Sequence, residues 1–411
     1  MATGESDDDA ASDYDALTAA DASFSDRYTA ARTAIDALAK PPGSLGTLEE
    51  WCARLCALQR RRDPRIESAT IVFVADHGVA KPIEDGGEGC SAYPPAVTTA
   101  IAALIARGRG GVSAIAAAAD AGPVTVYDVG LASGGGDTAA APPGVHQASF
   151  RLQGGTACFT TDTAISDLDL DRLMTAGADA VDALDDSVTV VVLGEVGIGN
   201  TTTAAALYAA LASTYRENAE DADSMSGSDD VNAVCGRGTG LDAAGVARKV
   251  DIVSRALKRH ADVVRDAHRA SRDGAADAGS AARRVLAALG GAEVAAMAGA
   301  AIRAYERGIA VMVGGFIATA AALAAASIEP KCTQSMFLTS LSAERGHAIA
   351  HKRIAALARA ASLPEVAMPA LAMGLCLGEG TAAALGVPLL RAAATLLPNM
   401  ATLEEALSGG A

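Results

Sequence analysis

Four short apolar runs, each rich in β-branched residues, constrain the fold of this chain more than any other feature. Alanine-rich stretches with helical spacing lie between them. Uninterrupted apolar runs of this length are typical of strands buried on both faces, and intervening helices are typical of parallel sheets. We therefore predict an α/β fold with a mainly parallel sheet covered by helices. The predicted strands are Ala69–Asp76, Pro123–Gly130, Ser187–Gly194 and Ile309–Gly315.

Three of these strands end in polar residues or glycine, namely Asp76-His77-Gly78, Asp128-Val129-Gly130 and Gly194-Glu195. Ligands of α/β sheets bind beyond the carboxyl ends of the strands, so we expect the functional site there. Asp76 and His77 fit an acid/base pair better than a metal site, because neither a third ligand nor a His-Glu-x-x-His motif accompanies them. His347 has the same ambiguity, and a structural hydrogen bond is its expected role.

A first glycine-rich segment, Gly194–Thr202, follows a predicted strand and precedes the helix-prone stretch Thr203–Ala212. Such a loop can direct backbone N–H groups at a phosphate. It does not match the loops that bind nucleoside triphosphates, since Asn200 stands where they carry lysine, and its glycines lack the dinucleotide-binding spacing. The alternative is a tight strand-to-helix turn. The candidate phosphate-binding residues are Gly194, Gly197, Gly199, Asn200 and Thr201.

A second glycine loop, Gly236–Asp242, precedes the amphipathic stretch Ala243–Leu257. Arg237 in the loop and Lys249 on the helix could supply cations to the same phosphate. The alternative is that Asp242 caps the helix and that Lys249 is solvated. The candidate residues are Gly236, Arg237, Gly238, Thr239, Gly240 and Lys249.

Two glutamates stand beside glycines in apolar surroundings. Glu195 lies next to the first set of candidate amides, where a carboxylate is unfavourable unless it serves the reaction or holds the loop. Glu379 lies between glycines in Leu377–Leu390, and burial would make it a stronger base, suited to general-base catalysis. A carboxylate stabilised by a helix N-terminus is the rival explanation for Glu379. The residues alone leave these two explanations for Glu379 about equal.

Composition excludes several classes of protein. The 411 residues are 50% hydrophobic, which is enough for one large α/β domain and a smaller one. The net charge is −16 and aromatic residues make up 3%, so we expect no nucleic-acid surface, and Arg60–Arg62 is predicted to be a solvated helix end. Seven cysteines without a Cys-x-x-Cys pair favour a reducing compartment, with Cys52 and Cys56 as small buried hydrophobes.

Targeting and membrane signals are also not expected. The acidic N-terminal segment, residues 1–25, has neither a basic region nor an apolar core, and it is predicted to be a disordered tail of a cytoplasmic protein. The uncharged stretch Gly308–Ile328 is rich in alanine and contains two adjacent glycines, so we predict a buried strand and helix in place of a membrane span. Residues 217–231 have no hydrophobic period and are predicted to be a mobile surface insertion.

Seven motifs together resemble the nicotinate-nucleotide:dimethylbenzimidazole phosphoribosyltransferase family of cobalamin nucleotide-loop assembly. The resemblance runs in order from about Leu38 to Met400. The motifs are KPPGSLGTLEE from Lys40, VFVADHGVA from Val72, GCSAYPPAVT from Gly89, LGEVGIGNTTTAAAL from Leu193, GRGTGLDAAGVARK from Gly236, GFIATAAAL from Gly315 and LGEGTAAAL from Leu377.

This resemblance implies transfer of a phosphoribosyl group from nicotinate mononucleotide to a benzimidazole nitrogen, giving α-ribazole 5′-phosphate and nicotinate. It implies Glu379 as the general base, both glycine loops with Lys249 as the 5′-phosphate site, and Glu195 as a second site residue. A flat apolar slot for the benzimidazole would be lined by Ser91, Tyr93, Val97 and Leu377. No metal or other cofactor is expected. The other class of function considered is a non-catalytic protein that binds a benzimidazole or its riboside.

The resemblance also implies a homodimer of subunits with a large Rossmann-like domain and a small helical domain. The expected divisions are the tail 1–25, an N-terminal helical segment of the small domain 26–66, the large α/β domain with the phosphate loops 67–330, and a C-terminal segment 331–411 that completes the small domain and carries the catalytic glutamate.

Three positions depart from the family pattern. The family has arginine before Leu-Gly-Glu-Gly, aspartate before Gly-Phe-Ile and a Ser-His-Arg run before Ser-Ala-Glu. This chain has Cys376, Gly314 and Thr339-Ser340-Leu341 at those places. A cation, a carboxylate and a histidine are therefore replaced together, which bears on phosphate affinity and on ordering of the base.

Overall fold

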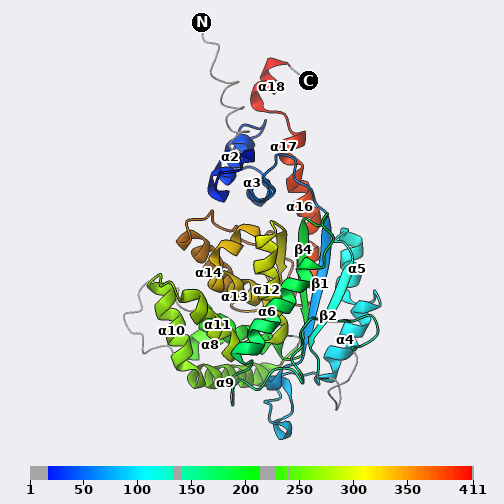
Figure 1. Ribbon diagram of the computed structural model, residues 1–411, viewed down its shortest axis with the longest axis vertical. Helices are drawn as coiled ribbons and strands as arrows, with labels where there is room; N and C mark the ends of the chain where they lie inside the picture. Colours follow the sequence, from blue (N-terminus) through cyan, green and yellow to red (C-terminus); the bar gives the residue numbers. More distant parts are fainter. Residues whose placement is uncertain (1–16, 133–140, 213–227, 239, 410–411) are drawn as a thin grey trace.

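The computed structural model describes residues 17–132, 141–212, 228–238 and 240–409 (Figure 1). Most of the predicted tail and most of the predicted insertion at 217–231 lie outside these residues. The strands are β1 Ser68–Ala75, β2 Val124–Gly130, β3 His146–Gln147, β4 Val190–Val196, β5 Ala310–Gly314 and β6 Met336–Ser340.

Helices occupy most of the remaining described chain. They are α2 Phe24–Asp36, α3 Thr47–Gln59, α4 Ala96–Ala106, α5 Gly111–Ala119, α6 Asp167–Asp182, α7 Asn200–Leu211, α8 Ser228–Val234, α9 Ala243–Arg259, α10 Ala261–Arg272, α11 Ala278–Leu289, α12 Ala292–Glu306, α13 Phe316–Ile328, α14 His347–Ala360, α15 Thr381–Ala384, α16 Val387–Ala394, α17 Leu396–Asn399 and α18 Leu403–Ser408. Short 3₁₀ turns lie at Gly78–Ala80, Ile83–Asp85 and Pro330–Ser335.

The strands form one six-stranded sheet in the order β3-β2-β1-β4-β5-β6. Every neighbouring pair is parallel, which confirms the predicted α/β fold. All four predicted strands are present in the centre of the sheet. The two remaining strands lie at its edges and were not predicted: β3 has two residues, and β6 is a five-residue run without a distinguishing hydrophobic pattern.

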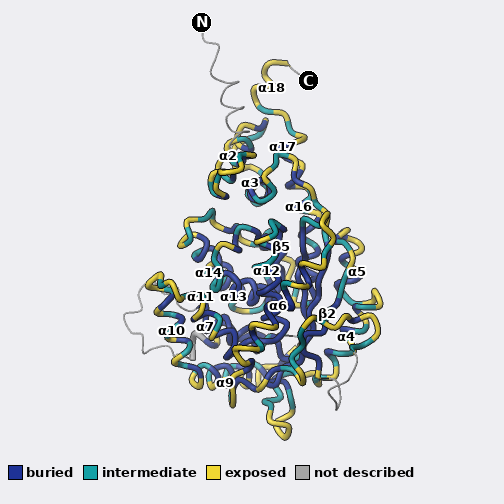
Figure 2. Tube along the Cα trace, in the orientation of Figure 1, coloured by how far each residue is buried: buried dark blue, intermediate teal, exposed yellow. Residues whose placement is uncertain are grey.

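Both faces of the sheet are covered, because successive residues of each strand point to opposite sides. In β4, Val191 and Leu193 pack with α7, α11, α12 and α13, whereas Val190 and Val192 pack with α3, α5 and α16. Figure 1 shows α4 and α5 on one side of the sheet and α6, α12 and α13 on the other. Strands β4, β5 and β6 are buried along their whole length and β1 from its second residue, as expected for a doubly covered sheet, whereas the edge strand β3 is exposed. The inner part of the fold is mostly dark in Figure 2.

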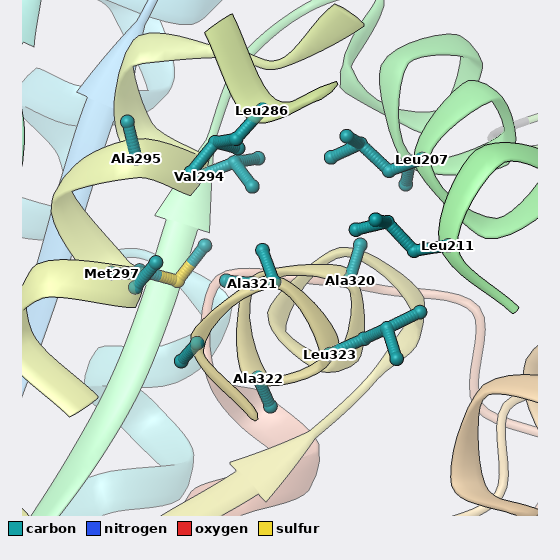
Figure 3. Packing of buried hydrophobic residues seen from close by; sticks show 14 of the residues in the cluster. Leu207, Leu211, Leu286, Val294, Ala295, Met297, Ala320, Ala321, Ala322 and Leu323 are labelled. Atoms are coloured by element: carbon teal, nitrogen blue, oxygen red, sulfur yellow. The ribbon is translucent and has the colours of Figure 1, made fainter. Parts of the chain in front are cut away.

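Alanine and glycine allow the covering helices to approach closely. A Cβ atom on Gly177 of α6 would lie 1.8 Å from the carbonyl oxygen of Ala296 in α12, and one on Gly299 of α12 would lie 2.0 Å from that of Met174 in α6. These helices are therefore in backbone contact at both glycines. In Figure 3, the alanines of α13 fit between the larger side chains of α7, α11 and α12.

The uncharged stretch at 308–328 consists of β5 and α13, both buried, as predicted. Two other stretches of the described residues are long and apolar enough to cross a membrane, Ala96–Ala119 and Thr381–Asn399. In the structure, the first stretch consists of α4 and α5, and the second consists of α15, α16 and α17. Core segments of a folded domain meet the same criteria of length and composition.

A second, smaller group of helices joins segments from opposite parts of the sequence. Helices α2 and α3 pack against α16 and α17 at the top of Figure 1, and Leu38 pairs with Thr402 in an antiparallel bridge. Trp51 contacts Phe337 of β6 edge-on, with ring centroids 5.8 Å apart. Cys52 and Cys56 are buried in α3, as predicted.

Two boundaries differ from those expected for the domains. Helix α2 begins at Phe24 and Leu17 is already buried, so packed structure begins inside the segment expected to be a tail. The sheet continues past residue 330, because β6 pairs with β5. The segment 331–411 thus contributes to the sheet as well as to the smaller group of helices.

Candidate active site

The three polar strand ends lie side by side, as predicted. Strands β2, β1 and β4 are neighbours, Phe73 is paired with Glu195, and Val74 is paired with Asp128. Asp128 accepts hydrogen bonds from the amides of Gly130 and Leu131 and so fixes the turn after β2.

The first glycine loop is shorter than the sequence predicts. Gly194 and Glu195 belong to β4, because their backbone pairs with β1, and the helix starts at Asn200. Only Gly197–Gly199 connects strand to helix. Gly194 is instead required for packing, since a Cβ atom there would lie 2.1 Å from the carbonyl oxygen of Glu379.

The first turn of α7 still presents amides to an anion. Gly199 has φ 98°, a left-handed conformation that favours glycine, and it is the N-cap of α7. The amides of Asn200 and Thr202 bond the carbonyls of Gly197 and Gly199, at 3.1 and 2.9 Å. Among the described residues, no such bond engages the amides of Gly199 and Thr201. Those two amides therefore remain available as hydrogen-bond donors at the N-terminus of α7.

Lys249 joins the two glycine loops. Its side chain is 1% exposed, and its Nζ atom donates to Thr201 Oγ1 and to the carbonyl of Gly236, both at 3.1 Å. Burial lowers the pKa of Lys249, and the Glu344 carboxylate opposes that shift. A Cβ atom on Gly238, which has φ 53°, would lie 3.0 Å from Thr201 Oγ1. Lys249 is thus not solvated, and the two loops share one cation.

Other residues of the second loop have different surroundings. Asp242 caps α9 through a 2.8 Å bond from the Gly245 amide, so this half of the alternative explanation is correct. Arg237 is exposed, and its Nε atom donates to the carbonyl of Leu241 in its own loop. Gly240 is exposed, with φ 125°. Thr239 lies outside the described residues.

Glu379 has an unusual backbone conformation, and it forms hydrogen bonds with β4 and with α5. Its φ of 63° is rare for a residue with a side chain, and its amide donates to the carbonyl of Glu195 at 3.2 Å. Its Oε2 atom accepts a 3.0 Å bond from the amide of Val112, in the first turn of α5. The residue is 9% exposed. The carboxylate is therefore largely buried, and it lies at the N-terminus of α5, a different helix from the one that follows Glu379.

Glu195 is a buried carboxyl group whose oxygens are both closely surrounded. Its Oε2 atom accepts a hydrogen bond from the side chain of Asn200, and a Cβ atom on Gly378 would lie 2.1 Å from Oε1. Burial raises the pKa of Glu195 well above its ordinary value, and the carboxylates of Glu293 and Glu379 raise it further. The shift favours the uncharged form of this carboxyl group.

His77 is buried among partners that sequence reasoning did not identify. Its Nε2 atom lies 2.8 Å from Glu293 Oε1, and its Nδ1 atom lies 3.0 Å from Thr203 Oγ1. Although burial opposes the charged form, the Glu293 carboxylate raises the pKa of His77. Each ring nitrogen of His77 therefore has a hydrogen-bonding partner. Glu293 has the same sequence signal as Glu379, a single carboxylate after glycines in an alanine-rich stretch, and this signal could have identified it.

His347 has the structural role expected of it. Its Nδ1 atom accepts a bond from the Ser342 amide and its Nε2 atom lies against Thr319 Oγ1, both at 2.7 Å. Burial lowers its pKa to about 4.

The candidate base-binding residues belong to two segments, one at the start of α4 and one just before Glu379. Ser91, Tyr93 and Val97 lie just before and at the start of α4, and the next residue, Thr98, accepts a 3.1 Å bond from the amide of Ile198. Leu377 lies close to Glu379, since a Cβ atom on Gly111 would be 2.8 Å from Leu377 Cδ2 and 3.0 Å from Glu379 Oε2. Tyr93 and Leu377 are each 48% exposed.

The departures from the family pattern have unequal structural consequences. Gly314 and Ser340 are paired at the ends of β5 and β6. A Cβ atom on Gly314 would lie 2.4 Å from Thr339 Oγ1 and 2.5 Å from the amide nitrogen of Ala383, so no side chain fits there. Cys376 is exposed. The region around Gly314 is therefore packed around a glycine, whereas position 376 has room for a larger residue.

Comparisons with known proteins identify the family of the chain. A family model described as a phosphoribosyltransferase matches residues 21–407. The chain is 36% identical over 380 residues to a nicotinate-nucleotide–dimethylbenzimidazole phosphoribosyltransferase of Chloroflexus aurantiacus, covering 92% of this chain and 93% of that protein. It is 38% identical over 373 residues to the protein of the same name from Pseudomonas aeruginosa, with 90% and 91% covered.

A solved structure shows the same fold. The crystal structure of CobT from Thermus thermophilus superposes with a TM-score of 0.72 at 36% identity, covering 92% of this chain and 98% of that one. Family model, sequence relatives and structure all span nine-tenths of the chain or more. The chain therefore belongs to the nicotinate-nucleotide–dimethylbenzimidazole phosphoribosyltransferase family.

Proposed function

We propose that this protein transfers the phosphoribosyl group of nicotinate mononucleotide to 5,6-dimethylbenzimidazole or a related base. The products are α-ribazole 5′-phosphate and nicotinate, for assembly of the lower ligand of cobalamin. The observation that carries this proposal is the position of Glu379. Its carboxylate is largely buried and its backbone bonds to Glu195, at the end of the strand that leads into the first phosphate loop.

The chemistry requires one base and one anion site. Nicotinate leaves the ribose from a cationic pyridinium and so needs no acid, whereas the attacking benzimidazole must lose its N–H proton. One ring nitrogen forms the bond to the anomeric carbon as the bond to nicotinate breaks, and Glu379 takes the proton from the other nitrogen. The amides of Gly199 and Thr201, together with Lys249, hold the 5′-phosphate.

Glu195 is assigned a supporting role in this scheme. It supplies the backbone carbonyl that positions Glu379, and its side chain holds Asn200 at the start of α7. Ser91, Tyr93, Val97 and Leu377 are proposed to line the slot for the flat base, because Leu377 lies close to Glu379 and the start of α4 contacts the loop at Ile198.

A turnover assay tests the proposal. The purified protein is mixed with nicotinate mononucleotide and 5,6-dimethylbenzimidazole, and released nicotinate is measured by chromatography. We expect equal amounts of nicotinate and α-ribazole 5′-phosphate, and no nicotinate when the base is omitted. Binding of both substrates without release of nicotinate would support the non-catalytic alternative.

We also propose that the protein is a cytoplasmic homodimer that binds neither nucleic acid nor membranes. All seven cysteines are free thiols, as suits a reducing compartment, and the net charge of −16 disfavours nucleic acid. Exposed apolar residues near the site, Met368, Met373 and Leu377, are suited to burial against a second subunit. Light scattering after size-exclusion chromatography measures the mass; a monomer at micromolar concentration would contradict the dimer.

A further inference from the structure

His77 connects three elements beneath the first phosphate loop. It lies two residues after the end of β1, and its imidazole lies between Glu293, in the first turn of α12, and Thr203, in the first turn of α7. His77 and Thr203 are at most 1% exposed, and Glu293 is fully buried. The contact therefore joins the end of a strand to the ends of two helices inside the core.

Glycines make room for this imidazole on two sides. A Cβ atom on Gly197 would lie 2.8 Å from His77 Nε2, and one on Gly291 would lie 2.5 Å from His77 Cε1. Backbone thus approaches the ring from the phosphate loop and from the turn before α12. A ring confined in this way has little freedom to rotate, and it transmits its position to both helices.

The first turn of α7 is consequently held from two sides. Lys249, on α9, donates to the Thr201 hydroxyl, and His77, after the end of β1, hydrogen-bonds with the Thr203 hydroxyl. Thr201 also carries one of the two amides proposed to bind phosphate. Fixing these amides before the nucleotide arrives favours binding of its phosphate, because less conformational freedom is lost on association.

We propose that His77 is a positioning residue which, through Thr203 and with Glu293 as its hydrogen-bond partner, fixes the first turn of α7 for binding the 5′-phosphate of the ribosyl donor. The inference rests on the proposed function, because the anion is the substrate's phosphate. It assigns no proton transfer to His77, which lies behind the loop, and it does not require contact between His77 and substrate.

The test removes the hydroxyl group of Thr203. Thr203→Val keeps the shape of the side chain and removes the contact with His77, while Thr203→Ser restores it. We expect Thr203→Val to weaken binding of nicotinate mononucleotide, measured by calorimetry, by about tenfold, equivalent to roughly 1.4 kcal/mol. We expect kcat to change by less than about threefold, because phosphate contacts hold ground state and transition state alike. Thr203→Ser should restore wild-type affinity.

A matched control separates positioning from general stability. Thr70 lies near the opposite end of β1, and its buried hydroxyl donates to the carbonyl of Ala121 at 2.9 Å. Thr70→Val removes one buried hydrogen bond by the same substitution, so the melting temperature should fall while affinity for nicotinate mononucleotide stays unchanged. Affinity for 5,6-dimethylbenzimidazole should be unchanged in both valine variants.

A double variant completes the experiment. In His77→Gln the contact is already altered, so adding Thr203→Val should weaken nucleotide binding less than it does in the wild type. If Thr203→Val lowers only the melting temperature, as Thr70→Val does, the inference is wrong and the proposed function stands. If the wild-type protein neither binds nor consumes nicotinate mononucleotide, both fail.

Discussion

The amide nitrogen of Glu379 lies 3.2 Å from the carbonyl oxygen of Glu195. This hydrogen bond joins the loop before α15 to the end of the central strand β4. It links the backbones of the two glutamates directly. It is possible because Gly194 and Gly378 carry no side chains, each of which would collide with the other glutamate's segment. The proposed base therefore takes its position directly from the sheet.

Glu379→Gln should abolish most of the turnover and leave nucleotide binding intact. Glutamine keeps the size of the side chain and can still accept the bond from Val112, but it has no basicity. The turnover number should fall by roughly 10²–10⁴-fold, the usual contribution of general-base catalysis. Calorimetry with nicotinate mononucleotide should give wild-type affinity. Near-normal turnover in this variant would assign the base elsewhere, and the comparison with Glu195→Gln would show whether the two roles are reversed.

Glu195→Gln should stabilise the protein at alkaline pH. The pKa of Glu195 is raised in the folded state, so its contribution to stability is full below its ordinary value of 4.5 and is lost as pH rises toward the folded value. Glutamine has no proton to lose and can still accept the bond from Asn200. Thermal unfolding should show a higher melting temperature than wild type at pH 8, by roughly 2 °C, with a smaller difference at pH 5. An equal difference at both pH values would contradict a protonated Glu195.

Restoring the family's aspartate at position 314 should destabilise the fold. The added Cβ atom has no space beside Thr339 and Ala383, and overpacking of a buried site costs about 1–3 kcal/mol before the buried charge is counted. The free energy of unfolding, measured with urea, should fall by at least that amount. If Gly314→Asp had wild-type stability, α15, which contains Ala383, would have to shift to make room for the new side chain.

Cys376→Arg is expected to be tolerated, because position 376 is exposed. A cation there, next to Leu377, should lower the Michaelis constant for nicotinate mononucleotide with a smaller change in turnover, which is the sign of improved uniform binding. Steady-state kinetics with varied nucleotide measure both constants. An unchanged Michaelis constant would show that the missing arginine has no part in nucleotide affinity in this chain.

Acid should unfold the protein partly through His347. Its pKa falls from 6.5 to about 4 on folding, so the unfolded state binds more protons between these values and stability declines as pH falls through that window. The full effect is ~3 kcal/mol at 1.36 kcal/mol for each pKa unit. Urea unfolding from pH 7 to pH 4 should show a shallower decline in His347→Asn, which can still accept the Ser342 bond. Parallel curves for the two proteins would refute this assignment.

Much of the fold could be predicted because it depends on local patterns. The runs that became β1, β2, β4 and β5 are continuous and apolar, and the ends of neighbouring parallel strands must meet. The position of Gly194 could not be predicted, because a glycine that permits a distant backbone to approach looks like a glycine that forms a loop. The buried state of Lys249 was equally inaccessible, since its partners lie in two loops whose meeting depends on the tertiary fold.

The site residues that were missed share a cause. Thr203 and Val112 act through contacts with residues more than 100 positions away in the sequence, and nothing in their local sequence marks them. Glu293 carried a visible signal, a charged residue in an alanine-rich stretch after two glycines. The same pattern predicts Glu379 as a site residue, and it is equally present at Glu293.

The bridge between Leu38 and Thr402 has a consequence for biosynthesis. A ribosome releases α2 and α3 early, but the helices that cover Trp51 and its neighbours are made almost last. The nascent chain must therefore carry an uncovered apolar surface through most of its translation, which makes it a candidate for chaperone binding. The segment that finally covers this surface follows directly after Glu379, so the proposed base reaches the sheet only when the rest of the chain can close around it.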